Sequence, residues 1–161
     1  MTRRDYAMLL LFVVVCQSAG GLGALFIWSE ISIWYAGLTK SWFNPPAWLF
    51  ASVWVTLYAL MAVAAWQVWR RRKEQAAAVR AALALFALQL LVNAAWTPVF
   101  FGWHALGMAL ATIILLLALI AATIIKFRRV HRPAGWLLIP YFAWVAFAAI
   151  LTGEFWRLNG C

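Results

Sequence analysis

Residues 34–48 read Trp-Tyr-Ala-Gly-Leu-Thr-Lys-Ser-Trp-Phe-Asn-Pro-Pro-Ala-Trp, and they connect the first two long apolar runs of the chain. Connectors are ordinarily polar and variable, but this one carries aromatic side chains at Trp34, Tyr35, Trp42 and Phe43. Large apolar groups in a loop need a surface to pack against. The sequence therefore predicts that a lid, residues 28–46, covers another part of the protein.

The exit of the lid is set by its prolines. A residue that precedes proline, here Asn44, is pushed out of the helical region, and Pro46 suits the first turn of a helix that begins at Ala47. We assign Trp34, Trp42, Asn44 and Pro46 to the lid. An alternative is an interfacial aromatic belt, since Trp and Tyr gather at the headgroup level of any membrane protein.

The composition is that of a membrane protein. Hydrophobic residues make up 68% of the 161 residues and charged residues 11%, compared with about 25% charged residues in soluble domains. The net charge of +9 would suit nucleic acid, but the basic residues flank apolar spans of roughly 20 residues, enough to cross a bilayer. We therefore expect a lipid bilayer as partner and no nucleic acid.

Five apolar spans predict the fold class, an all-α integral membrane protein built as a bundle of five transmembrane helices. Residues 1–161 form a single domain, with spans at about 6–27, 47–69, 81–101, 105–125 and 135–156. The first span begins like a secretory or twin-arginine signal peptide, but its apolar run continues past Gly20 for another seven residues, which favours a retained helix. Small residues on this span and on the fourth would allow another helix, or another subunit, to approach closely.

The basic residues predict the orientation. Eleven of the thirteen lie on the side of the N-terminus, namely Arg3, Arg4, Arg70, Arg71, Arg72, Lys73, Arg80, Lys126, Arg128, Arg129 and Arg132. Only Lys40 and Arg157 lie on the other side. Because cytoplasmic loops carry the excess of Lys and Arg, we expect a cytoplasmic N-terminus and a C-terminus on the opposite side, with the lid.

Tryptophans predict a cavity under the lid. Eight of the twelve fall in the lid-side half of the spans, three on the basic side, and Trp144 near the middle, whereas two interfacial belts would share them evenly. Spans one, two, three and five would form the walls, with Trp144 at the floor. Gln89, Asn93 and Trp96 lie on one helical stripe and provide orienting amides. The alternative is aromatic packing without a ligand.

Several separated motifs together resemble the TspO/MBR family, which comprises translocator proteins, tryptophan-rich sensory proteins and peripheral-type benzodiazepine receptors. These motifs are Trp34-Tyr35, Lys40, Trp42, Asn44-Pro45-Pro46, Trp54, the run from Asn93 through Trp96-Thr-Pro to Gly102, and Pro140-Tyr141 with Trp144. They agree in order and spacing over nearly the whole chain. The resemblance implies a bacterial member of the family.

The resemblance also implies a ligand and an assembly. Members form five-helix bundles, often homodimers, that bind porphyrins such as protoporphyrin IX and isoquinoline or benzodiazepine-type drugs, with sterol in some members. Carried over by motif, the ligand pocket uses Tyr35, Pro45, Trp54, Tyr58, Asn93, Trp96, Trp144 and Ala148, to which the polar stripe adds Gln89. No obligatory cofactor is implied, and porphyrin is the expected ligand.

Two positions depart from the family pattern. Ser41 stands where many members have proline after the lid lysine, which predicts a less rigid lid. The cholesterol motif of the last helix needs a tyrosine, but this chain offers Phe155 and Trp156. We therefore rank sterol below porphyrin.

The sequence holds no constellation of ordinary catalytic groups. No acidic residue lies deep in a span, and His104 and His131 fall on opposite sides of the membrane, so they cannot share one metal ion. Neither a disulfide nor a metal site is predicted. Three functions remain: a porphyrin-binding sensor or receptor, light-dependent porphyrin degradation through Trp54 and Trp144, and a transporter of small amphipaths such as tetrapyrroles or sterols.

Overall fold

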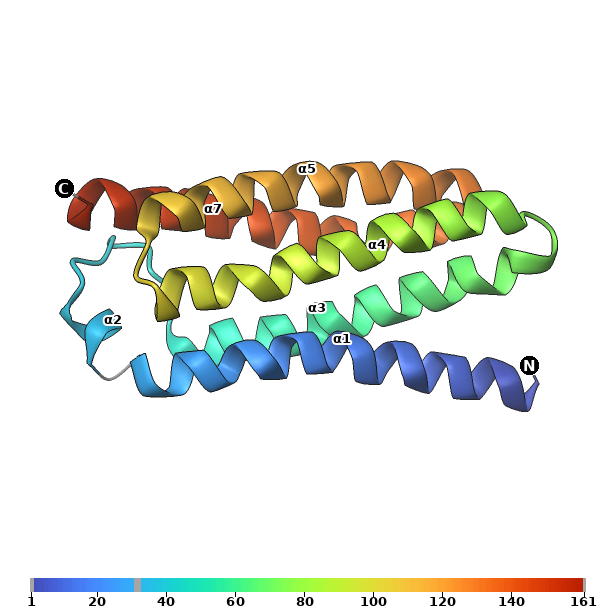
Figure 1. Ribbon diagram of the computed structural model, residues 1–161, viewed down its shortest axis with the longest axis horizontal. Coiled ribbons are helices and arrows are strands. Elements are labelled where there is room, and N and C mark those ends of the chain that lie inside the picture. Colours follow the sequence, from blue (N-terminus) through green and yellow to red (C-terminus); the bar gives the residue numbers. More distant parts are fainter. Residues whose placement is uncertain (1, 31–32, 161) are drawn as a thin grey trace.

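The computed structural model describes residues 2–30 and 33–160, with side chains for 2–23 and 33–160, and it is helical with no strand in those residues. Figure 1 shows the long helices lying side by side in a bundle, with the two termini at opposite ends. The helices are α1 (Arg3–Glu30), α2 (Trp34–Gly37), α3 (Ala47–Arg70), α4 (Ala76–Thr97), α5 (Leu106–Val130), α6 (Arg132–Trp136) and α7 (Ile139–Asn159).

Within the described residues, five helical segments are long and apolar enough to cross a membrane, which confirms the predicted fold class. They are Arg3–Gly23, Ala47–Lys73, Ala76–Gly102, Leu106–Val130 and Arg132–Asn159. The helices extend beyond the predicted spans: α1 reaches Glu30, α4 begins at Ala76 and α5 reaches Val130. The difference arises because hydropathy marks the part of a helix inside lipid, whereas backbone hydrogen bonding continues into the polar interface.

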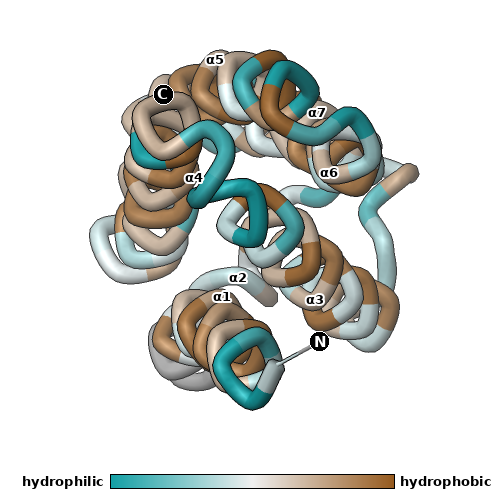
Figure 2. The backbone as a smooth tube through the Cα atoms, turned by 90° about the vertical axis from the view of Figure 1, so that its right-hand side faces the viewer, coloured by the Kyte–Doolittle hydropathy of each residue, from teal (hydrophilic) through white to brown (hydrophobic). Residues whose placement is uncertain are grey.

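The long helices form a closed ring in cross-section. Viewed along the bundle, α1 packs beside α3 and α4, and α5 packs beside α4 and α7 (Figure 2). The outward faces remain apolar, as shown by Leu10, Leu91 and Ile150, which are all more than 60% exposed. A helix that is hydrophobic all round belongs in lipid or in a large core, so this surface fits a bilayer.

Glycines of α1 let the first helix approach its neighbours within the bundle. A Cβ atom at Gly20 would overlap the ring of Tyr58 on α3, and one at Gly23 would lie 2.9 Å from Oγ1 of Thr97 on α4. On α5, Gly107 faces the indole of Trp156, and a Cβ atom there would lie 3.4 Å from the indole Nε1. Gly20 and Gly23 therefore meet helices of the same chain, whereas Gly107 is exposed and the contact of a Cβ atom there would be an ordinary one, so an approach by another subunit at Gly107 stays a prediction.

Pro98 reshapes the end of α4. Its ring cannot continue the α-helical hydrogen bonding, and residues Pro98–Gly102 form a π-helical turn that follows Thr97. This turn buries Val99, Phe100 and Phe101. It thereby turns phenylalanine rings toward the lid-side half of the bundle.

Candidate functional site

A cavity of about 870 Å³ lies in the lid-side half of the bundle. Its volume falls within the range of about 300–1,000 Å³ that is typical of small-molecule sites. All five long helices and the lid contribute to its walls. The fourth span was not among the predicted walls, but Ile113 and Leu116 of α5 also line the cavity. They do so because α5 closes the ring between α4 and α7.

Most of the ligand-binding residues predicted from the sequence line this cavity. They are Tyr35, Pro45, Trp54, Tyr58, Asn93, Trp96 and Ala148. Two of them form a continuous aromatic wall on α3, where the rings of Trp54 and Tyr58 lie 5.4 Å apart between centroids. Their spacing of four residues puts them on one helix face, so the sequence pattern was sufficient to predict this wall.

Gln89 does not line the cavity, contrary to the prediction. It is 1% exposed and lies behind Tyr141, whose hydroxyl donates a hydrogen bond to Gln89 Oε1 at 2.9 Å. Four residues along a helix correspond to about 6 Å of depth, and at the depth of Gln89 the Tyr141 ring fills the centre of the bundle. The amide of Gln89 therefore supports the floor of the cavity.

The floor is a chain of buried hydrogen bonds that joins three helices. Tyr58 Oη donates to Asn93 Oδ1 at 2.6 Å, and Asn93 Nδ2 donates to Tyr141 Oη at 2.8 Å. Polar groups in an apolar interior are costly unless they are paired. This pairing fixes the rings of Tyr58 and Tyr141 relative to Asn93 and makes the floor rigid.

Trp144 also lies outside the cavity lining, which corrects its predicted role as the floor. Its ring packs against Phe50 at 5.7 Å and against Phe147 at 5.5 Å between centroids. Phe50 is the side chain that lines the cavity at this place. Sequence reasoning missed Phe50 because a single phenylalanine near the start of an apolar helix carries no distinguishing pattern.

Phenylalanines complete the wall opposite α3, and the prediction had named none of them as ligand-binding residues. The rings of Trp96 and Phe100 are stacked with centroids 5.0 Å apart. Phe101 and Phe155 also line the cavity. Phe100 continues the helical stripe of Asn93 and Trp96, whereas Phe101 and Phe155 lie off that stripe and are brought to it by the folded backbone.

Aromatic residues of α2 hold the lid over the cavity. Tyr35 packs on Phe101 and Phe155, with centroids 5.7 and 5.5 Å away, and its hydroxyl donates to Asn44 Oδ1 at 3.0 Å. Burial raises the pKa of the Tyr35 phenol, which keeps it protonated as a donor. Trp34 stacks on His104 at 4.1 Å.

The rest of the lid divides into covering and outward residues. Asn44, Pro45 and Pro46 line the cavity as predicted. Trp42, in contrast, is 95% exposed. Its indole therefore faces away from the protein and does not cover the cavity, which fits the alternative role of an aromatic group at the membrane interface.

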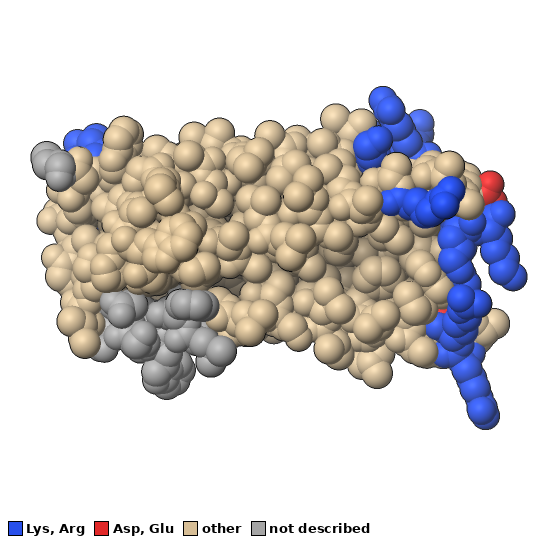
Figure 3. All heavy atoms as spheres, in the orientation of Figure 1, with Lys and Arg blue, Asp and Glu red and all other residues tan. Residues whose placement is uncertain are grey.

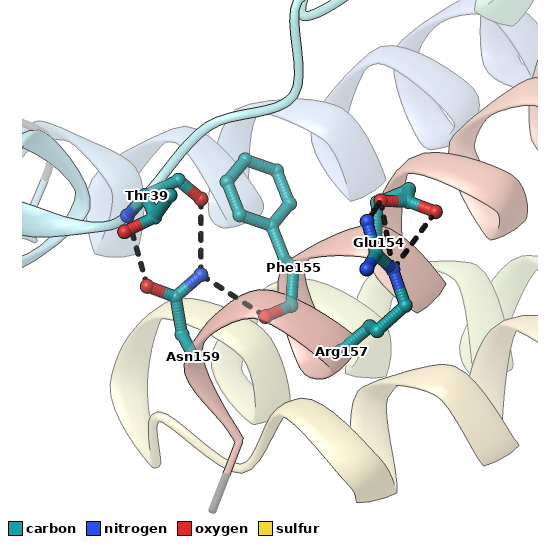
Figure 4. Close-up of polar contacts among 5 residues, drawn as sticks. All are labelled: Thr39, Glu154, Phe155, Arg157 and Asn159. Carbon is teal, nitrogen blue, oxygen red and sulfur yellow. Dashed lines mark hydrogen bonds and ion pairs between the residues drawn. The ribbon is translucent and has the colours of Figure 1, made fainter.

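A pair of hydrogen bonds fastens the lid to the end of α7, as Figure 4 shows. The Thr39 N–H donates to Asn159 Oδ1 at 2.8 Å, and Asn159 Nδ2 donates to the Thr39 carbonyl at 3.0 Å. One amide side chain thus satisfies both backbone groups of a loop residue, as a neighbouring strand would. We call this pair the Asn159 clasp.

Charge is sparse around the cavity. Among the described lining residues, Lys40 is the only charged one, and its Nζ lies 4.8 Å from the centroid of the Tyr35 ring. The described part of the chain brings no group of three or more His, Cys, Asp or Glu residues together. The cavity therefore offers flat apolar walls, a rigid polar floor and one cation at the lid.

Fold and site together define a multi-pass membrane protein that encloses a cavity of small-molecule size. The chain belongs to the TspO/MBR family, whose model matches residues 12–157. It is 39% identical to the tryptophan-rich sensory protein of Cereibacter sphaeroides over 155 residues, covering 96% of this chain and 93% of the relative. It is 38% identical to the translocator protein of Ovis aries over 148 residues, covering 92% and 88%.

Proposed function

We propose that this protein is a membrane receptor that binds a porphyrin of the protoporphyrin IX type in the cavity under the lid. The observation that carries the proposal is an aromatic-walled cavity of about 870 Å³ whose only charged lining residue, among those described, is Lys40. A porphyrin is a large flat ring with carboxylates along one edge. Such a ligand needs flat apolar walls and a cation at one end, and this cavity provides both.

The same arrangement supports one orientation of the proposed ligand. The carboxylate edge would lie at the lid, beside the Lys40 ammonium group. The ring would extend between Trp54 on α3 and Trp96 on α4 toward the floor formed by Asn93. Below that floor Met61 is fully buried, so the bundle is filled and the ligand stops there.

A comparison of two tryptophan variants tests the proposal. Trp54→Leu removes one wall of the cavity and should weaken protoporphyrin IX binding by roughly 1 to 3 kcal/mol, or about five- to 150-fold. Trp66→Leu is the matched control, because Trp66 lies near the basic end, where its Nε1 donates to the Asp5 carbonyl. Titration followed by porphyrin absorption measures both affinities. Equal losses in the two variants would refute a lid-side pocket.

Light-dependent degradation of the bound porphyrin is a second candidate, favoured by the indole of Trp54 in the cavity wall. The excited ring and dioxygen would act next to an oxidisable side chain. Because Trp144 packs one layer further out, against Phe50, we expect Trp54→Phe to slow the loss of porphyrin absorption under light more than Trp144→Phe does. Equal rates in the parent and both variants would contradict this role.

Transport of amphipaths is the alternative function, and it makes a different demand on the bundle. A carrier must open the floor that Tyr58, Asn93 and Tyr141 close. Porphyrin flux across sealed vesicles that contain the protein would establish transport. Binding without flux would leave the receptor as the better description.

A homodimer is also part of the proposal, and Gly20 and Gly23 do not provide its surface, because they pack against helices of the same chain. On α5, Ala111 is exposed and Ile114 and Leu115 are each more than 50% exposed. We expect Ala111→Leu to weaken a dimer that uses this face. Crosslinking in membranes measures it, and an unchanged dimer yield would exclude this face as the interface.

A further inference from the structure

A second cavity lies at the opposite end of the bundle from the lid, where α3 turns into α4. It has a volume of about 620 Å³ and is lined by Trp69, Arg72, Ala76, Val79, Arg80 and Leu83. Two of these six residues are arginines and none is acidic. Basic side chains crowd this end of the molecule in Figure 3. The cavity is separate from the proposed porphyrin site, and the inference does not depend on that proposal.

One arginine of this cavity is already held in place. The Arg72 guanidinium lies 3.3 Å from the centroid of the Trp69 ring, and Arg72 Nη1 donates to the Trp69 carbonyl at 3.2 Å. A guanidinium has five N–H donors, and this contact uses one of them. Stacking on the indole therefore orients the group at little further cost in side-chain entropy and leaves donors for a ligand.

The charge around the cavity is not neutralised by the protein. Arg80 is exposed, and no ion pair involving it occurs among the described residues. Glu74, the nearest carboxylate in sequence, pairs instead with Arg71 at 3.2 Å. An anion placed between Arg72 and Arg80 would thus meet two cations with no competing carboxylate in the lining.

The lining of this cavity changes from charged to apolar between the end of the bundle and its middle. Arg72 lies in the turn before α4, and Arg80 lies one turn into the helix. Leu83 is three residues further along α4, or about 4.5 Å deeper, and Val79 is 3% exposed and part of the core. The groove is therefore cationic at its outer end and apolar at its inner end.

We propose that this groove binds an anionic phospholipid. The phosphate lies between the guanidinium groups of Arg72 and Arg80, and the start of an acyl chain runs along Val79 and Leu83. Basic pockets between helices at the cytoplasmic side of a membrane recognise such headgroups. A free phosphate ion would use the arginines but not the apolar wall, so the wall favours a lipid.

The test uses the full chain in a neutral detergent with added phosphatidylglycerol. The lipid should raise the midpoint of thermal unfolding in a saturable way, whereas phosphatidylcholine or inorganic phosphate should not. A basic residue near an anionic lipid surface contributes about 1 kcal/mol to binding. The double variant R72Q/R80Q should therefore raise the half-saturating lipid concentration about 30-fold. R80Q alone should raise this concentration about fivefold. Because the Arg80 side chain is exposed, this variant should fold like the parent.

A charge-matched control separates a site from general attraction. K126Q/R129Q also removes two positive charges, but from exposed positions near the end of α5. This variant should respond to phosphatidylglycerol as the parent does. An equal loss in both double variants would overturn the proposal in favour of diffuse electrostatics. A response to inorganic phosphate as strong as that to phosphatidylglycerol would overturn it in favour of an anion site without a lipid.

Discussion

The Asn159 clasp should control how fast a ligand leaves the cavity. Asn159→Ala removes both hydrogen bonds to Thr39, of 2.8 and 3.0 Å. A protein hydrogen bond contributes about 0.5–1.5 kcal/mol net, and the lower part of that range applies where water can replace the partner. The clasp lies at an exposed position, so the variant should favour lid opening by about 1–2 kcal/mol, or five- to 30-fold.

Release of protoporphyrin IX measures this effect. If the lid must open before the ligand leaves, the dissociation rate of Asn159→Ala should rise by the same five- to 30-fold. Dissociation is followed by stopped-flow absorption after mixing with excess apo-haemoprotein as a porphyrin trap. Asn159→Asp should give a smaller rise, because the carboxylate still accepts from the Thr39 N–H but can no longer donate to its carbonyl.

The control for the clasp lies less than one turn away. Arg157 pairs with Glu154 at 2.7 Å on the same helix (Figure 4) and makes none of the hydrogen bonds to the lid. Arg157→Gln should therefore leave the dissociation rate unchanged. If Asn159→Ala released porphyrin at the parent's rate, or if Arg157→Gln accelerated release equally, the clasp would not hold the lid.

Three further predictions concern packing, pH and orientation. Gly20→Ala should lower the free energy of unfolding by about 1–3 kcal/mol, because the new methyl group overlaps the Tyr58 ring. Gly21→Ala should be neutral or stabilising, because the space around Gly21 is open. Thermal unfolding in detergent measures both variants. Burial and nearby arginines lower the pKa of His131 in the folded protein. The contribution of His131 to stability is therefore present above its unfolded pKa of about 6.5 and is lost as the pH falls below that value. The parent should lose more thermal stability than His131→Gln as the pH is lowered through this range. Cys161, which lies outside the described residues, should react with a membrane-impermeant thiol reagent in intact spheroplasts.

Each of these three has a contrary outcome. Equal unfolding midpoints for the Gly20 and Gly21 variants would mean that the ring of Tyr58 moves aside freely. Identical pH profiles of the parent and the His131 variant would assign the acid sensitivity to other groups. Labelling of Cys161 only after lysis would reverse the orientation, since buried Cys16 is shielded from the reagent.

The sequence alone determined the class, the number of spans and one wall of the cavity. Apolar runs of transmembrane length specify helices in a bilayer, because backbone groups in lipid must satisfy one another within the helix. Trp54 and Tyr58 could be placed together because four residues of one helix fix their relation. The lid could be recognised because Trp34 and Tyr35 are costly in a loop unless they are covered.

Tertiary structure decided which side chains reach the cavity and which stop behind another ring. Gln89 and Trp144 share helix faces with lining residues, yet Tyr141 and Phe50 occupy the space in front of them. Helix periodicity gives the direction of a side chain but not the position of its neighbour on another helix. The Asn159 clasp joins residues 120 positions apart in the sequence. Only the packing of α7 against the rest of the bundle brings this amide to the backbone of the lid.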